Sequence, residues 1–144
     1  MTLYLPDGLN SSPDPILDIL RRSKTIAVVG LSSNPTRPSH AVAAYLQSAG
    51  YRIFPVNPNE REVLGEKAYA RLEDIPEPVD IVDIFRRADY VPPVLDSAIA
   101  VRARVAWLQL GIENPPASEK VRATGLLVVE NACLLVEHKK RRPI

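Results

Sequence analysis

A strand, a single glycine and the start of a helix follow one another within residues 26–40, which have the sequence IAVVGLSSNPTRPSH. The apolar, β-branched run ends at Gly30, a small polar loop follows, and we expect a helix to begin near Ser39. A strand–loop–helix turn of this kind presents backbone N–H groups and a helix N-terminus to an anionic ligand. The pattern therefore favours a fold built from βα units and predicts a phosphate-binding loop.

The glycine spacing of this loop is not that of a dinucleotide site. A nicotinamide or flavin site needs three glycines, for the tight turn, the pyrophosphate approach and the helix packing. Ser32, Asn34 and Thr36 stand where further glycines would be. An NAD site also needs an acidic residue after the second strand to hold the ribose hydroxyls, and here the first acid is Glu60. The loop is predicted to bind a phosphate group but not NAD.

Composition limits the class of protein further. The chain has 144 residues, of which 46% are hydrophobic and 24% charged, and we expect one globular domain over residues 1–144. The net charge of +1 argues against nucleic acid as a partner. We expect no membrane partner, since no apolar run approaches the roughly 20 residues of a membrane span, and no leader in residues 1–14. The single Cys133 and two histidines predict no disulfide and no metal site. These features predict a cytoplasmic protein.

Helical and strand patterns alternate along the chain. We expect an α/β fold of three layers, with a mostly parallel, doubly wound sheet covered by helices on both faces. Asp14 is the expected N-cap of the first helix and Ser118 that of the last clear one; Pro55 either weakens its strand slightly or places it near a sheet edge. Residues 134–138 fit a strand or a helix, and the basic tail 139–144 is expected to be frayed. The predicted helices are 15–23, 39–49, 92–103 and 118–123; the long strands are 25–31, 51–56, 79–85, 105–110 and 126–130; a short strand 67–69 and a helical turn 72–75 lie between.

Ligands of such sheets lie at the carboxyl ends of the strands, where the strand order switches. The segments that follow the strands are therefore the candidate site. They are rich in amides, hydroxyls and arginines, which line a pocket for a polar, anionic ligand. The arginines there either grip phosphates through their guanidinium groups or are solvated surface. The segments are 32–37, 57–61, 86–90, 109–113 and 131–133, and the arginines are Arg37, Arg61, Arg86 and Arg87.

Four other residues have chemistry to consider. His40, at the helix start, contacts a phosphate, braces the loop or is satisfied by the backbone. Cys133 follows the last strand and is either a small buried hydrophobic residue or a nucleophile at the pocket rim. His138, beside the basic tail, is expected in solvent, and Trp107 is expected in the core.

In their order and spacing, the motifs resemble those of the stand-alone coenzyme A-binding domain proteins. The resemblance extends to the N-terminal Rossmann-like domain of the succinyl-CoA synthetase α subunit and covers residues 16–137. It is carried by residues 26–40, Tyr45-Leu46, Gly50-Tyr51, Pro55-Val56-Asn57-Pro58-Asn59, residues 80–87 (DIVDIFRR), residues 107–112 (WLQLGI) and Asn131-Ala132-Cys133.

The resemblance implies that coenzyme A (CoA) lies across the strand ends with its phosphates over the first loop. Residues carried over from the family pattern would surround the whole cofactor. Arg37 and His40 also match the pattern, without an assigned contact. The phosphates or pantetheine would meet Gly30, Ser32, Ser33 and Asn34; the adenine–ribose end would meet Asn57, Pro58 and Asn59; Arg86 and Arg87 would flank the cofactor; Gln109 and Asn131 would face the pantetheine.

The resemblance also bears on activity. The synthetases transfer phosphate through a histidine in a second domain and bind nucleotide in a β subunit. We expect no such domain here, and the sequence has no Walker-type Gly-rich loop. We therefore expect a binding protein for CoA or an acyl-CoA without catalysis of its own. The alternatives are an enzyme that uses a CoA thioester or a nucleotide, with Cys133 or His40 as its reactive group, and a redox or nucleotide sensor that binds a dinucleotide at the same site.

Overall fold

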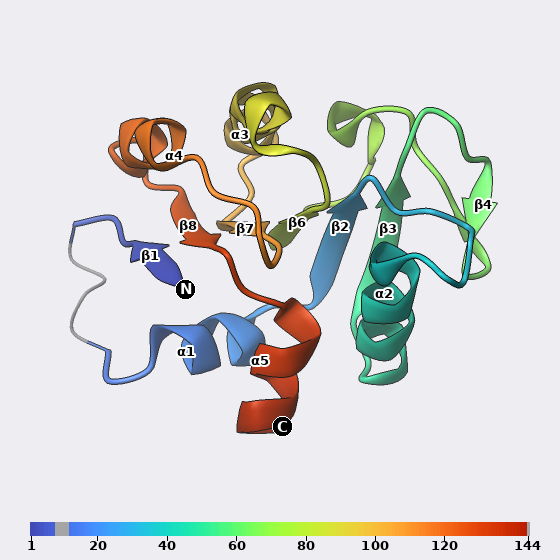
Figure 1. The fold of residues 1–144 in the computed structure, drawn as a ribbon, viewed down its shortest axis with the longest axis horizontal. Helices are drawn as coiled ribbons and strands as arrows, with labels where there is room; N and C mark the ends of the chain where they lie inside the picture. The colour runs from blue at the N-terminus through green and yellow to red at the C-terminus, as the bar shows by residue number, and fades with distance from the viewer. Residues whose placement is uncertain (8–11, 144) are drawn as a thin grey trace.

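The computed structural model describes residues 1–7 and 12–143 of the chain and has a sheet of six strands at its centre. The strands lie in the order β1-β8-β7-β6-β2-β3, and a separate two-stranded hairpin pairs β4 with β5 (Figure 1). β1 is antiparallel to β8, and the other pairs of the large sheet are parallel. The strands are β1 (Thr2–Tyr4), β2 (Thr25–Val29), β3 (Arg52–Val56), β4 (Glu62–Val63), β5 (Glu66–Lys67), β6 (Ile81–Ile84), β7 (Val105–Leu108) and β8 (Leu127–Glu130).

Helices cover both faces of this sheet, so the predicted three-layer, doubly wound α/β fold is confirmed. Buried residues of α1, α2 and α5 form one apolar cluster with one face of the strands. Residues of α3, α4 and η1 form a second cluster with the other face. The α-helices are α1 (Pro15–Arg22), α2 (Pro38–Ser48), α3 (Val91–Ala100), α4 (Pro115–Arg122) and α5 (Leu134–Arg141), and the short 3-10 helices are η1 (Leu72–Asp74) and η2 (Ala88–Tyr90).

The strand order switches at β2. The chain passes from β2 to β3 on one side and then crosses over to β6 on the other, from where β7 and β8 continue outward. The connections after β2 and β6 therefore diverge, and a crevice is expected where they part. β3 is the edge strand, which is one of the two outcomes expected from Pro55, and the Pro55 carbonyl accepts a hydrogen bond from Tyr69 N–H (2.9 Å) on the side away from β2.

The start of α4 corrects a sequence prediction. The helix begins at Pro115, and its N-cap is Asn114, whose side chain accepts a hydrogen bond from Ala117 N–H (3.3 Å). Prolines are favourable in a first helical turn, where their missing N–H has no partner to lose. Ser118 is not the cap: it is fully buried, and its hydroxyl donates to the Glu130 carboxylate at 2.7 Å.

The C-terminal segment corrects two more sequence predictions. Residues 134–138 form a helix, and it continues to Arg141, so residues 139–141 are not a frayed tail; residue 144 of that tail lies outside the described residues. His138 is buried rather than solvated; it is 8% exposed, and its Nδ1 shares a hydrogen bond of 2.7 Å with the Tyr45 hydroxyl. Burial lowers the pKa of this imidazole. His138 is thus part of the core, and residues 139–141 are part of a helix.

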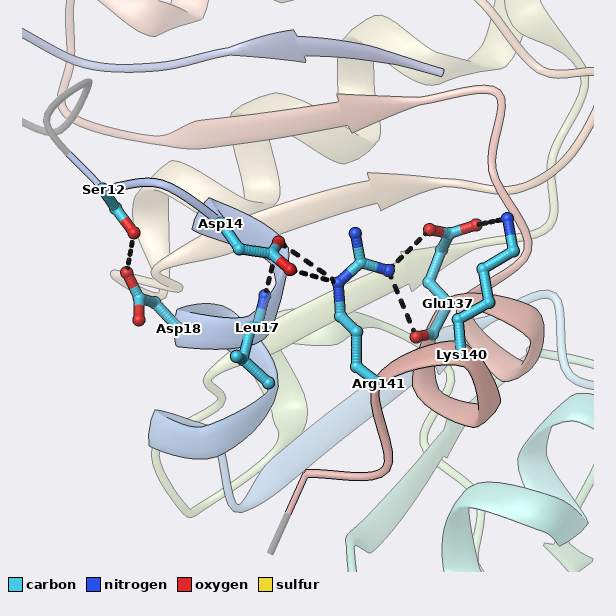
Figure 2. A network of polar contacts seen from close by, with 7 residues as sticks. All are labelled: Ser12, Asp14, Leu17, Asp18, Glu137, Lys140 and Arg141. Carbon is cyan, nitrogen blue, oxygen red and sulfur yellow. Dashed lines mark hydrogen bonds and ion pairs between the residues drawn. The ribbon is translucent and has the colours of Figure 1, made fainter.

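Arg141 fastens α5 to α1, as Figure 2 shows. Its Nε donates to Asp14 (3.0 Å to Oδ2) and its Nη1 to Glu137 (2.8 Å to Oε1). Asp14 is also the N-cap of α1, as predicted, accepting from Leu17 N–H at 3.2 Å. Burial alone would raise the pKa of Asp14, but the hydrogen bonds from Arg141 and Leu17 outweigh it and lower that pKa. One carboxylate therefore caps one helix and anchors another.

Candidate functional site

Gly30 joins the carboxyl ends of three strands. Its N–H donates to the Val56 carbonyl of β3 (2.8 Å), and Phe85 N–H, after β6, donates to Val29 (2.9 Å). Gly30 has φ of +88°, and a Cβ placed on it would lie 2.6 Å from the Phe85 carbonyl oxygen. Only glycine fits both the positive φ and this close approach. The position is therefore fixed as the floor of the crevice at the strand switch.

A pocket of about 340 Å³ opens above this floor. It brings together Gly30, Ser32 and Arg37, three of the predicted site residues, on the first loop and at the start of α2. Three more lining residues, Pro38, Ser39 and Phe85, had not been predicted. Ser39 is the clearest omission, because its hydroxyl accepts a hydrogen bond from Ser32 N–H at 3.1 Å and so shapes the loop.

The loop is held by its own side chains. The Ser32 hydroxyl accepts from Asn34 N–H (3.1 Å), and Asn34 Oδ1 accepts from Thr36 N–H (3.0 Å) and from the Thr36 hydroxyl (2.8 Å). Such side-chain acceptors stabilise turns in place of backbone partners. Small polar residues therefore hold the turn of this loop, while Ser33 and Asn34 remain exposed.

The turn after β3 is fastened to the same loop. Asn57 Nδ2 donates to the Leu31 carbonyl (3.0 Å), and Asn57 Oδ1 accepts from Asn59 N–H (2.9 Å). Pro58 and Asn59 at the tip of the turn are exposed, as is Arg61 beyond it. The predicted residues of this segment are thus adjacent to the first loop, and Asn57 acts there by positioning backbone.

The two predicted arginines after β6 separate. Arg86 is exposed and lines a second pocket of about 280 Å³ on the α3 side of the β2 end, together with Arg71. Arg87 instead pairs with Asp89 (3.5 Å), and its guanidinium carbon lies 5.2 Å from the centre of the Tyr90 ring. Arg71 had not been predicted, since it follows no long strand.

Two predicted amides lie outside the 340 Å³ pocket. Gln109 is buried, and its Oε1 accepts from Leu134 N–H (3.2 Å) at the start of α5. Asn131 has φ of +57°, and its Oδ1 accepts from Gly111 N–H at 2.7 Å. Both amides therefore hold the loops at the far end of the strand edge.

The two candidate reactive residues also lie outside that pocket. His40 is half-buried in the first turn of α2, and its backbone N–H donates to the Arg37 carbonyl (3.1 Å). Cys133 is the half-buried N-cap residue of α5. Neither His40 nor Cys133 therefore lines the pocket at Gly30.

One buried acid near the strand ends was not singled out from the sequence. Asp83 is fully buried in β6, with Val28 and Trp107 as its register neighbours, and neither carboxylate oxygen has a hydrogen-bond partner among the described residues. Burial raises the pKa of this carboxyl well above its usual range. An acid between Val82 and Ile84, inside the apolar run of residues 81–85, was the signal in the sequence.

Membrane spans and metal clusters are both missing from the described residues. In that part of the chain no helix has the length and apolar character to cross a membrane. The same residues contain no cluster of three or more His, Cys, Asp or Glu side chains able to hold a metal ion.

Residues 24–139 match the family model described as the CoA binding domain. The chain belongs to the CoA-binding domain family. The match covers the strand switch, the first loop and all of the predicted site residues, and it agrees with the resemblance that the motifs carried.

Relatives of two kinds accompany the family match. The first kind is as short as this member of the CoA-binding domain family. The protein YneT of Bacillus subtilis (strain 168) is 44% identical over 129 residues, which are 90% of this chain and 96% of YneT. A hypothetical protein from Pyrococcus horikoshii OT3 has a solved structure that matches with a TM-score of 0.85 and 39% identity, covering 88% of this chain and 89% of that one.

The second kind is much longer. The ADP-forming acetate–CoA ligase II of Archaeoglobus fulgidus is 36% identical over 83 residues, which are 56% of this chain and 12% of the ligase. The CoA-binding domain described here therefore corresponds to a small part of that enzyme.

Proposed function

We propose that the protein binds coenzyme A or an acyl-CoA, with the phosphates over the loop at residues 30–37, and has no catalytic machinery of its own. The observation that carries the proposal is the pocket at Gly30, where the first loop and Arg37 meet the N-terminus of α2. Anionic groups are stabilised at such a helix end by its N–H groups and dipole. The family match supports CoA as the anionic ligand.

The residues divide into two kinds of role in this proposal. Gly30, Ser32, Ser33, Asn34 and Arg37 contact the phosphates or the start of the pantetheine. Arg86 binds the adenosine end from the second pocket, together with Pro58 and Asn59 of the turn after β3. The remaining residues of the set position backbone or neighbouring side chains: His40, Asn57, Arg87, Gln109 and Asn131.

The test is calorimetric titration of the protein with CoA, 3′-dephospho-CoA, acetyl-CoA, NAD and ATP. We expect CoA to bind, and to bind more weakly without its 3′-phosphate. Binding of NAD or ATP without CoA would refute the proposal and favour the dinucleotide or nucleotide alternative.

Arg86→Ala tests the adenosine end of the site. Loss of one guanidinium–phosphate contact should weaken CoA binding by about tenfold. Arg21→Ala is the matched control, because Arg21 is an exposed arginine in the last turn of α1, whose end lies at the opposite end of the sheet. Equal affinities of the two variants would remove Arg86 from the site.

A further inference from the structure

A carboxylate from the neighbouring turn occupies one N–H group of the first loop. Glu60 Oε2 accepts a hydrogen bond from Ser33 N–H at 2.7 Å, although the two residues are 27 positions apart. The N–H groups of Ser32, Asn34 and Thr36 all bond to neutral oxygens. Ser33 is therefore the position of the loop where a negatively charged acceptor is already bound.

Glu60 is kept at this position by the turn that carries it. Glu60 N–H donates to the Asn57 carbonyl (3.2 Å), and the Asn57 side chain in turn donates to Leu31 (3.0 Å). The Glu60 backbone is thus fastened to the loop, and rotation of its side chain alone would release Ser33 N–H. Glu60 is half-buried, and among the described residues no Lys, Arg or His lies within ion-pair distance of it.

Carboxylate and phosphate oxygens are the same kind of partner for a backbone N–H. Both are anionic acceptors that form short, charge-assisted bonds. A single N–H cannot serve both fully, and the two negative charges repel each other across the few ångströms of the loop.

We propose that Glu60 is an internal competitor of the ligand's anionic group, which must leave Ser33 N–H when the ligand binds. The inference rests on the proposed function and adds a residue that sets affinity and selects ligands. A ligand displaces Glu60 only if the free energy that it gains on binding outweighs the loss of the Glu60–Ser33 bond. A ligand with an anionic group gains part of that free energy at Ser33 N–H itself, which a neutral ligand does not.

Calorimetry of Glu60→Gln with CoA is the first test. Glutamine keeps an oxygen that accepts from Ser33 N–H, so the loop keeps its shape, but the charge is gone. We expect CoA to bind roughly tenfold more tightly than to the unmodified protein, since a charge-assisted competitor becomes a neutral one. The gain should shrink as KCl is raised, because salt screens the repulsion.

Glu62→Gln is the matched control. It removes the same charge two residues away, on the exposed start of β4, where the register partner of Glu62 is Lys67 of β5. We expect its CoA affinity to stay near that of the unmodified protein. Equal gains in both variants would reduce the effect to net charge and overturn the inference; where CoA binds the unmodified protein, unchanged or weaker binding by Glu60→Gln would overturn it as well.

The Ser33 amide resonance in ¹⁵N spectra separates this inference from the proposed function. Pyrophosphate should shift that resonance at lower concentration in Glu60→Gln than in the unmodified protein, whether or not CoA binds. If CoA binds neither protein but pyrophosphate behaves in this way, the proposed function fails and the competition stands. If pyrophosphate acts equally on both, or on neither, the competition is refuted.

Discussion

Gly30 and Phe85 approach each other more closely than any other residue at position 30 would allow, since a Cβ there would lie 2.6 Å from the Phe85 carbonyl oxygen. The contact joins the ends of β2 and β6, the two parallel strands between which the strand order of the sheet reverses. The first loop leaves the sheet from this point, so its course toward α2 depends on the contact.

Gly30→Ala should therefore destabilise the protein more than an alanine at a glycine with free space. A positive φ costs a non-glycine residue about 1–2 kcal/mol, and the clash with backbone should add roughly 1–3 kcal/mol. Gly50→Ala is the control, because Gly50 has φ of +105° but a Cβ added to it would meet none of the described atoms within 4 Å. Urea unfolding of both variants measures the difference; equal losses would mean that the Phe85 contact relaxes freely.

Asp83 should make the protein less stable as the pH rises. Burial raises the pKa of Asp83 well above that of an unfolded aspartate, so the folded state holds the proton more tightly. The contribution of Asp83 to the free energy of unfolding is fully present below about pH 4, the ordinary pKa. It is lost as the pH rises toward the folded-state pKa, by at most about 1.4 kcal/mol per pH unit.

Asp83→Asn removes this titration, because an amide does not ionise. The free energy of unfolding of the unmodified protein, minus that of the variant, should fall between about pH 4 and neutrality. Urea titrations at several pH values provide the measurement. A difference independent of pH would contradict a neutral, buried Asp83.

Arg141→Gln tests the contact between α1 and α5. This variant should lower the free energy of unfolding at neutral pH by about 1 kcal/mol. The value is modest because the Asp14 side chain is 39% exposed and water screens the pair. The pKa of Asp14 is lowered, so its contribution is present above about pH 4 and is lost as the pH falls through the folded-state pKa. The effect of Arg141→Gln should therefore shrink in acid.

Arg142→Gln is the control for this pair, since Arg142 is exposed at the C-cap of the same helix. Urea unfolding of the two variants at neutral and acidic pH gives the comparison. A similar loss for both would show that helix α5 responds to charge in general and not to the bond with Asp14.

The order of strands and helices could be predicted because most elements are buried on a recognisable face. The apolar runs of β2, β6 and β8 stand between prolines, glycines and polar turns, and that spacing fixes a βα alternation. β1 was missed because a strand of three residues is too short to show a hydrophobic periodicity. The end of α5 was missed because a run of lysine and arginine looks solvated; the partner of Arg141 is Asp14, 127 positions away.

The site could be predicted in part for a similar reason. Position after a strand identifies Gly30, Ser32 and Arg37, because parallel strands end at one edge of the sheet. It does not distinguish a side chain that faces a pocket from one that holds backbone, as Gln109 and Asn131 do. Glu60 was noted only as an acid too late for an NAD site, and its bond to Ser33 depends on how the turn after β3 folds back.

His138 gives the last prediction, which opposes that of Asp83 in its direction. Burial lowers the pKa of His138 in the folded state, so the unfolded chain binds the proton more tightly. Its contribution to stability is present above about pH 6.5, the ordinary pKa, and is lost as the pH falls toward the folded-state pKa. His138→Gln should remove this loss while keeping a polar partner for the Tyr45 hydroxyl, 2.7 Å from Nδ1. His40→Gln is the control and should retain the loss of stability in acid, since His138 is still present. Thermal unfolding of the two variants between about pH 5 and 8 measures the difference. Identical pH profiles for the two variants would refute the assignment to His138.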